Sequence, residues 1–190
     1  IATANHVKPV NDTTLNDDFS YRVSDNDGDI SVGAATQTIT VTDTVPEIGT
    51  PDNAAVSEEN LLTGADPDNN ELTKNGSLQV TKSADSIDTQ FTDNVLDPTT
   101  TTGGLSVLML QSGGVSVEYV LADTHTLIAY RGSFRTEADK VFTVTITDAD
   151  ADTAGYSFTL ARPLDHPTAA DINLPFNFSV TDSDNDTVSD

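Results

Sequence analysis

Three aspartate triplets with alternate spacing are the residues of this chain best suited to chemistry. Each triplet follows a run in which aliphatic residues alternate with Thr or Ser, and the three sets are Asp25, Asp27 and Asp29; Asp148, Asp150 and Asp152; and Asp182, Asp184 and Asp186. In an extended segment, side chains at i, i+2 and i+4 point to the same side. Calcium binds about 6 to 8 oxygen ligands, mainly carboxylates and carbonyls. The triplets therefore predict three calcium sites.

The charge around the triplets supports a bound cation. Three carboxylates gathered at about 4 Å repel one another by roughly 1 kcal/mol per pair in water, and by more near a protein surface. The only Lys or Arg within a few residues of any triplet is Arg22. A divalent cation is a simpler compensation than protonation. The alternative is that Asp, Asn and Gly merely form solvated turns, but recurrence after three strand ends favours calcium.

A fourth acidic cluster also offers oxygen ligands at alternate positions, with Asp66 and Asp68 as its candidate metal ligands. The intervening Pro67 constrains how this segment can wrap around an ion. None of the four clusters resembles an EF-hand, because the twelfth positions counted from Asp25 and Asp148 are Thr36 and Thr159 instead of Glu. The sequence therefore predicts calcium as the cofactor, bound at sites that are not EF-hands.

Composition excludes several other classes of function. With 31 acidic against 8 basic residues the formal net charge is -23, which disfavours nucleic acid and anionic membrane surfaces as partners. No apolar run is long enough to insert into a bilayer. The chain has no cysteine, its histidines are scattered, and it contains no Gly-x-Ser-x-Gly motif. We therefore expect no enzymatic activity.

The elements that position the triplets are predicted to be β-strands. Apolar and polar residues alternate with period two in short runs, with no helical spacing. Turn-forming residues separate these runs, at Asn75–Gly76, Gly103–Gly104 and Ser112–Gly114. The fold class predicted is all-β, an immunoglobulin-like or cadherin-like antiparallel β-sandwich. The runs are 19–23, 38–42, 78–80, 105–110, 115–120, 127–130, 142–147, 156–160 and 176–180.

An internal repeat defines the expected domain organisation. The segment that leads into Asp25 aligns with the segment that leads into Asp182, at an offset of 182 − 25 = 157 residues. Val45–Ile48 is expected to be a linker, because Pro46 cannot continue a strand ladder. We expect residues 1–44 to be the C-terminal part of one β-sandwich repeat. Residues 45–190 would then be the next repeat in a tandem array, without its last strand.

The chain resembles the tandem repeats of giant RTX adhesins, which bacteria export by type I secretion. The segments that carry the resemblance are Val56–Leu61, Leu110–Gly114, Val141–Thr145, Gly155–Leu160, Pro163–His166 and Asp182–Asp184. The resemblance covers residues 45–190, with 1–44 as the tail of a preceding copy. It implies an extracellular chain of β-sandwich modules at the bacterial cell surface, stiffened by calcium and folding only once calcium is met outside the cell. A metal at Asp148 is inferred from the residues and is not implied by the family.

Two functions follow as expectations. The leading one is a calcium-stabilised structural repeat whose partners are calcium ions and neighbouring repeats, and which extends a ligand-binding region for attachment and biofilm formation. The alternative is a calcium-dependent module that binds a cell-surface glycan or protein. The absence of Trp disfavours a stacking platform for sugars. The residues from which an exposed binding patch would be built are Tyr119, Tyr130, Phe134 and Arg135.

Overall fold

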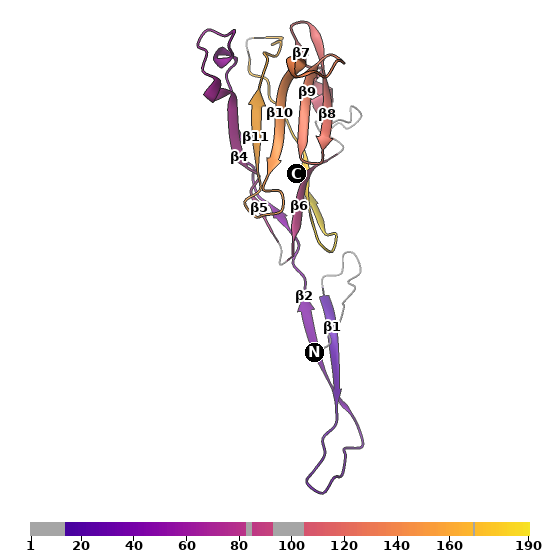
Figure 1. Cartoon of the computed structure of the whole chain (residues 1–190). Helices are drawn as coiled ribbons and strands as arrows, with labels where there is room; N and C mark the ends of the chain where they lie inside the picture. The colour runs from indigo at the N-terminus through magenta and orange to yellow at the C-terminus, as the bar shows by residue number, and fades with distance from the viewer. Residues whose placement is uncertain (1–13, 83–84, 93–104, 169) are drawn as a thin grey trace. The chain divides into compact units, whose positions relative to one another are not determined.

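The chain forms two compact units, Ile1–Val45 and Pro46–Asp190, which we call unit 1 and unit 2. A computed structural model describes residues 14–82, 85–92, 105–168 and 170–190 (Figure 1). The division lies next to the module boundary expected after residue 44. That the two units are successive repeats stays a prediction.

Unit 1 contains an antiparallel hairpin of β1 (Thr14–Tyr21) and β2 (Ala35–Thr42). One face of the hairpin is polar: the Thr38 hydroxyl donates to the Asp18 carboxylate at 2.6 Å. The other face is apolar, and Phe19 and Ile39 on it remain 53% and 50% exposed. The hairpin therefore has the two-faced pattern of a sandwich strand pair, with its apolar face exposed among the described residues.

The larger sheet of unit 2 has six antiparallel strands. Its order is β4 (Thr73–Ser77), β11 (Gly155–Leu160), β10 (Lys140–Thr147), β9 (Thr126–Arg131), β8 (Val115–Asp123) and β7 (Gln111–Ser112). A smaller sheet has the order β13 (Thr187–Ser189), β12 (Phe178–Asp182) and β6 (Ile87–Phe91). A short pair joins β3 (Glu47–Ile48) to β5 (Val80–Thr81).

The core of unit 2 lies between the larger and the smaller sheet. Phe142 on β10 stacks on Phe158 of β11 at 5.4 Å between ring centroids, and meets Phe176 edge-on at 6.3 Å. Val144 and Val180, from opposite sheets, are 1% and 0% exposed and belong to one hydrophobic cluster. Each such side chain contributes about 1.5–3 kcal/mol by leaving water. The predicted all-β antiparallel sandwich is confirmed.

Helical structure in the described residues is limited to short 3-10 turns. These turns are η1 (Glu58–Asn60), η2 (Asn69–Leu72), η4 (Leu105–Leu108) and η5 (Glu137–Asp139). No helix in the described part of the chain is long and apolar enough to span a membrane.

Four local predictions are wrong. The run 78–80 is not a strand, because Leu78 and Gln79 lie between β4 and β5 and Gln79 has φ +54°. The apolar run 105–110 contains η4 in place of a strand, and Met109 within it has φ +48° and is 86% exposed. In so short an apolar run, periodicity alone cannot distinguish a strand from a helical turn. Asn75–Gly76 lies inside β4, where Gly76 leaves room for Tyr156: a Cβ at Gly76 would come within 2.5 Å of that ring. The expected linker Val45–Ile48 includes β3, since Glu47 pairs with Thr81. Gly103–Gly104 lies outside the described residues.

Candidate metal sites

The triplet of unit 2 forms the tight turn between β12 and β13. The backbone N–H of Asp182 donates to the carbonyl of Asp186 at 3.0 Å, and the N–H of Asp186 donates to Asp182 Oδ1 at 2.9 Å. Asn185 donates to the Asp182 carbonyl at 3.2 Å and has φ +73°. Asp182 and Asp186 are only 5% and 7% exposed. The turn therefore holds two carboxylates in a largely buried position.

The triplet of unit 1 forms the same turn. Asp25 N–H donates to the Asp29 carbonyl at 3.0 Å, and Asp29 N–H donates to Asp25 Oδ1 at 3.0 Å. Gly28 donates to the Asp25 carbonyl at 3.3 Å and has φ +97°. A positive φ suits Gly or Asn, the residues found at this position in the two turns. The flanking bridge between Ser24 and Ile30 matches the pairing of Thr181 with Thr187.

The two turns thus correspond residue for residue at the offset of 157 (182 − 25) that the repeat predicts. Each is closed by a hydrogen bond between a carboxylate and the backbone four residues later. The bond holds one carboxylate oxygen of the first Asp inside the turn. The sequence therefore specifies this turn locally, in two separate units.

Among the described residues, each unit contains a group of three carboxylates close enough to share an ion. Asp25, Asp27 and Asp29 each offer an oxygen within 4.8 Å of the others, and Asp85, Asp182 and Asp184 do the same. Calcium–oxygen distances are about 2.3–2.6 Å, so two ligands of one ion lie at most about 5 Å apart. Both groups meet this requirement and consist only of hard oxygen donors. Backbone carbonyls and water would complete the coordination.

The two groups differ in exposure and in electrostatics. Burial raises the pKa of Asp182 above its ordinary 3.8, and the neighbouring Asp184 raises it further. In unit 1 the triplet is exposed, and hydrogen bonds from Asp27 and from the Asp29 backbone lower the pKa of Asp25. Ionising every carboxylate of the unit 2 group is therefore unfavourable without a compensating cation. A bound calcium ion would supply that compensation.

Sequence reasoning missed Asp85. This residue lies two positions before β6, which pairs with β12 so that Ile87 is opposite Asp182. The strand pairing carries Asp85 to the triplet from about a hundred residues away in the sequence. The available signal is weak: an Asp that precedes an alternating strand is common, and β6 was not predicted as a strand.

The structure does not bring the other predicted ligands together. Asp148, Asp150 and Asp152 are exposed in the turn between β10 and β11, and their carboxylates do not form a group within 4.8 Å. Ala149 and Ala154 face the core there. Asp66 and Asp68 are also exposed and join no group of three among the described residues. Calcium at these two places stays a prediction, without the geometry that supports the other two.

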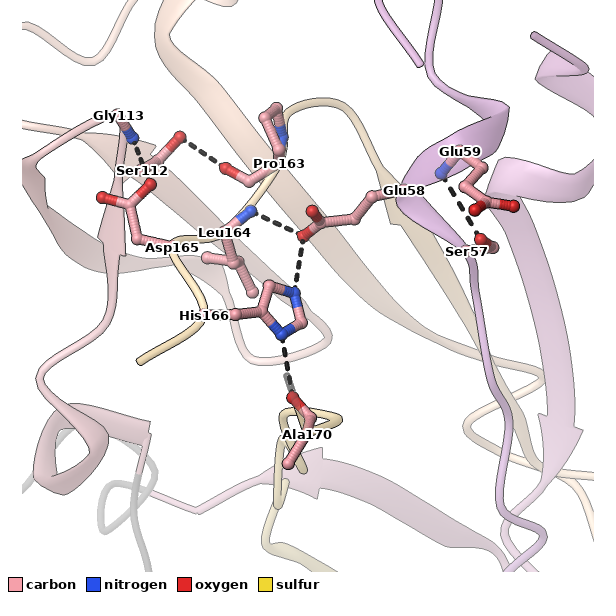
Figure 2. A network of polar contacts seen from close by, with 10 residues as sticks. All are labelled: Ser57, Glu58, Glu59, Ser112, Gly113, Pro163, Leu164, Asp165, His166 and Ala170. Carbon is pink, nitrogen blue, oxygen red and sulfur yellow. Dashed lines mark hydrogen bonds and ion pairs between the residues drawn. The ribbon is translucent and has the colours of Figure 1, made fainter. Parts of the chain in front are cut away.

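A separate polar network fixes the tract Pro163–His166 (Figure 2). Glu58 Oε1 accepts from the Leu164 N–H at 2.7 Å and lies 3.4 Å from His166 Nε2. The Asp165 carboxylate accepts from the N–H groups of Gly113 and Gly114, at 2.8 and 2.6 Å. The carbonyl of Ala170 and the carboxylate of Glu58 raise the pKa of His166 above 6.5. These contacts tie three loops together, which is a structural role.

The proposed binding patch is only partly exposed. The Tyr119 ring packs against Phe142, its hydroxyl is buried, and burial raises the pKa of Tyr119 to about 12. Tyr130 is 9% exposed, whereas Phe134 is 85% exposed. Arg135 lies 3.9 Å from Glu118. Only Phe134 and Arg135 are therefore available to a partner.

Comparison with known proteins finds no match for this chain among family models, curated proteins or solved structures.

Proposed function

We propose that this chain is a calcium-stabilised structural segment of a bacterial surface adhesin, in which calcium stiffens β-sandwich repeats. One observation carries the calcium part: the same aspartate turn occurs in both units, each time within a group of three carboxylates inside 4.8 Å. The adhesin part rests on the resemblance of residues 45–190 to RTX adhesin repeats. Under this proposal the chain acts outside the cell, at the bacterial surface.

The position of the unit 2 group supports a structural role for the ion. Asp85 precedes β6, whereas Asp182 ends β12 and Asp184 lies in the turn that follows. One ion bound to all three would join two segments of the smaller sheet that are distant in the sequence. It would also neutralise charge in a chain of net charge -23. Such a link stabilises the folded state, because the unfolded chain does not hold the ligands together.

The two groups are expected to differ in affinity. The carboxylates of unit 2 are partly or largely buried, with Asp182 5% exposed, so water screens their charge less. The unit 1 triplet is exposed throughout. Extracellular calcium modules bind with dissociation constants of about 10⁻⁴ to 10⁻³ M. We expect the unit 2 site to bind more tightly than the unit 1 site.

Thermal unfolding of the full chain in chelator, calcium or magnesium tests the proposal. Calcium should raise the melting temperature, since one site contributes about 2.7 kcal/mol at a hundredfold excess over its dissociation constant. Magnesium should substitute poorly, because it demands octahedral geometry and sheds its water reluctantly. Isothermal titration calorimetry would give the number of ions. An unchanged melt on adding calcium would reject the calcium-stabilised role.

The alternative, a ligand-binding module, is favoured by one observation only, the exposed Phe134 beside Arg135. A glycan array probed with and without calcium distinguishes the two functions. Binding that requires both calcium and Phe134 would favour the alternative over the structural repeat.

A further inference from the structure

Unit 2 contains a cavity of about 530 Å³, which is within the range of about 300–1,000 Å³ that is usual for binding pockets. The segments that line it are 108–111, 165–168 and 170–173. Leu108 and Met109 are 39% and 86% exposed in one wall, and Ile172 adds apolar surface in the other. Methionine is flexible and polarisable, so Met109 can adapt to whatever fills the space. The cavity therefore suits an apolar side chain.

The charged side chains of the cavity favour a cation beside that apolar group. Asp171 and Asp165 are both exposed, and the carboxylate of Asp165 accepts two backbone N–H groups. His166 also lines the cavity, but its ring nitrogens face a backbone carbonyl at 3.0 Å and the Glu58 carboxylate at 3.4 Å. Asp171 is therefore the charge through which the cavity would attract a partner. A suitable occupant carries an apolar side chain next to a positive one.

The loop 132–136, between β9 and η5, presents such a combination. Phe134 is 85% exposed, and Arg135 follows it. Arg135 lies 3.9 Å from Glu118, and both side chains of this ion pair are about half exposed. Exposed ion pairs contribute little to stability, so the guanidinium of Arg135 can change partner at small cost. The loop thus matches the cavity in apolarity and in charge.

The backbone of this loop holds Phe134 in a defined position. The Gly132 N–H donates to the Ser116 carbonyl at 2.9 Å, and Gly132 has φ +71°. Arg135 has φ +50°, a conformation that residues other than glycine rarely adopt. Strained backbone of this kind is concentrated at functional sites. A loop that is already fixed also loses little conformational freedom when it binds.

The loop and the cavity are neighbours on the surface of unit 2. The N–H of Val117 in β8 donates to the carbonyl of Leu110 in the cavity wall at 2.8 Å. The next residue of β8, Glu118, is the one that Arg135 approaches. The strands β7, β8 and β9 that carry these residues are adjacent in the larger sheet (Figure 1). Two adjacent and complementary surfaces can pair reciprocally with the same surfaces of a second copy, about a two-fold axis.

We propose that Phe134 of one copy of this chain inserts into the cavity of a second copy, where Arg135 pairs with Asp171, and that the reciprocal contact forms a two-fold dimer. Each dimer would then contain two apolar anchors in pockets, with a charged pair at the edge of each. Buried aromatic anchors surrounded by polar contacts are typical of stable interfaces. The proposal rests on this loop and this cavity, and on neither calcium nor the adhesin role.

Sedimentation velocity of the full chain over a range of concentrations tests the proposal. Salt at about 0.15 M screens the repulsion between two chains of net charge -23. The wild type should show a monomer–dimer equilibrium, and Phe134→Ala should weaken it at least about tenfold, because the anchor is lost. Tyr21→Ala is the matched control, because Tyr21 is a 55% exposed aromatic residue of unit 1 that is also followed by an arginine. It should leave the equilibrium unchanged.

Two charge variants test the contact between copies directly. Arg135→Glu alone and Asp171→Lys alone should each lose the dimer, because like charges then meet at both contacts. An equimolar mixture of the two variants should dimerise again, because each substituted residue then faces an opposite charge on the other copy. A contact within one copy cannot produce this recovery. Thermal melts of each variant check that the fold is kept, since both side chains are exposed.

Three results would each overturn the proposal. A wild type that stays monomeric at every concentration would mean that the cavity serves another occupant, such as a small ligand. A dimer that Phe134→Ala leaves intact, or that Tyr21→Ala weakens as much, would lie on another surface. Charge variants that do not dimerise on mixing would refute the pairing of Arg135 with Asp171.

Discussion

Replacing Asp184 with asparagine is expected to change the stability of unit 2 in opposite directions with and without calcium. Asp184 shares a group with Asp85 and Asp182, in which all three carboxylates offer oxygens within 4.8 Å. Without calcium, the substitution removes one of three mutually repelling charges. With calcium, it removes a charged ligand. Asp182 is not the residue chosen, because its carboxylate closes the turn by accepting the backbone N–H of Asp186.

The expected magnitudes follow from the geometry. Two unit charges about 5 Å apart repel by about 1 kcal/mol in water and by about 3 kcal/mol at an effective dielectric constant of 20. In chelator, Asp184→Asn should therefore gain about 1 kcal/mol or more. In calcium at a hundredfold excess over its dissociation constant, loss of the site removes up to about 2.7 kcal/mol. For a domain of this size, that loss lowers the melting temperature by about 5–10 °C.

Differential scanning calorimetry of the wild type and the variant, each in chelator and in calcium, measures both effects. Asp190→Asn is the matched control, because Asp190 is exposed, belongs to no gathered group and is not a predicted calcium ligand. It should change the free energy of unfolding by no more than about 0.5 kcal/mol in either buffer. If Asp184→Asn and Asp190→Asn behave alike in calcium, or if Asp184→Asn destabilises in chelator, the carboxylates do not form the site described.

Two further predictions concern pH. In chelator, the raised pKa of Asp182 stabilises the folded state fully below about pH 4, and this contribution is lost as pH rises through the raised pKa. The urea midpoints of the wild type and of Asp182→Asn should therefore diverge between pH 4 and pH 7. Urea midpoints that change in parallel with pH would contradict the burial assigned to Asp182. The pKa of His166 is raised by the Ala170 carbonyl and by Glu58, so its contribution is present below about pH 6.5 and lost at higher pH. His166→Gln should therefore cost more stability at pH 6 than at pH 8. Glu58→Gln should reduce that difference without removing it, because the Ala170 carbonyl remains.

Patterns confined to a few neighbouring residues were predictable from the sequence. The period-two alternation of Phe142–Thr147 is confirmed in β10, because one face of that strand is buried against a core. The turn Ser112–Gly114 is confirmed as well, since Gly113 and Gly114 adopt positive φ between β7 and β8. In each case the signal lies in local backbone preference and side-chain alternation, which a single sequence displays.

Features that depend on which strands pair were not predictable. Leu105 is fully buried in a 3-10 turn, although its run has the composition of a strand. Gly76 lies within β4, and the Tyr156 ring of β11 occupies the space that a Cβ would fill. Both outcomes were decided by residues distant in the sequence, whose packing overrides local preference.

The same distinction applies to the aspartates. The sequence by itself determined the turn that gathers Asp25 with Asp29 and Asp182 with Asp186, because its hydrogen bonds join residues four apart. Only the tertiary structure decided which carboxylates meet: the pairing of β6 with β12 brings in Asp85. The carboxylates of the turn at Asp148 form no group within 4.8 Å, and Ala149 of that turn packs on the core. A metal site requires convergence in space, and spacing along the chain supplies only part of it.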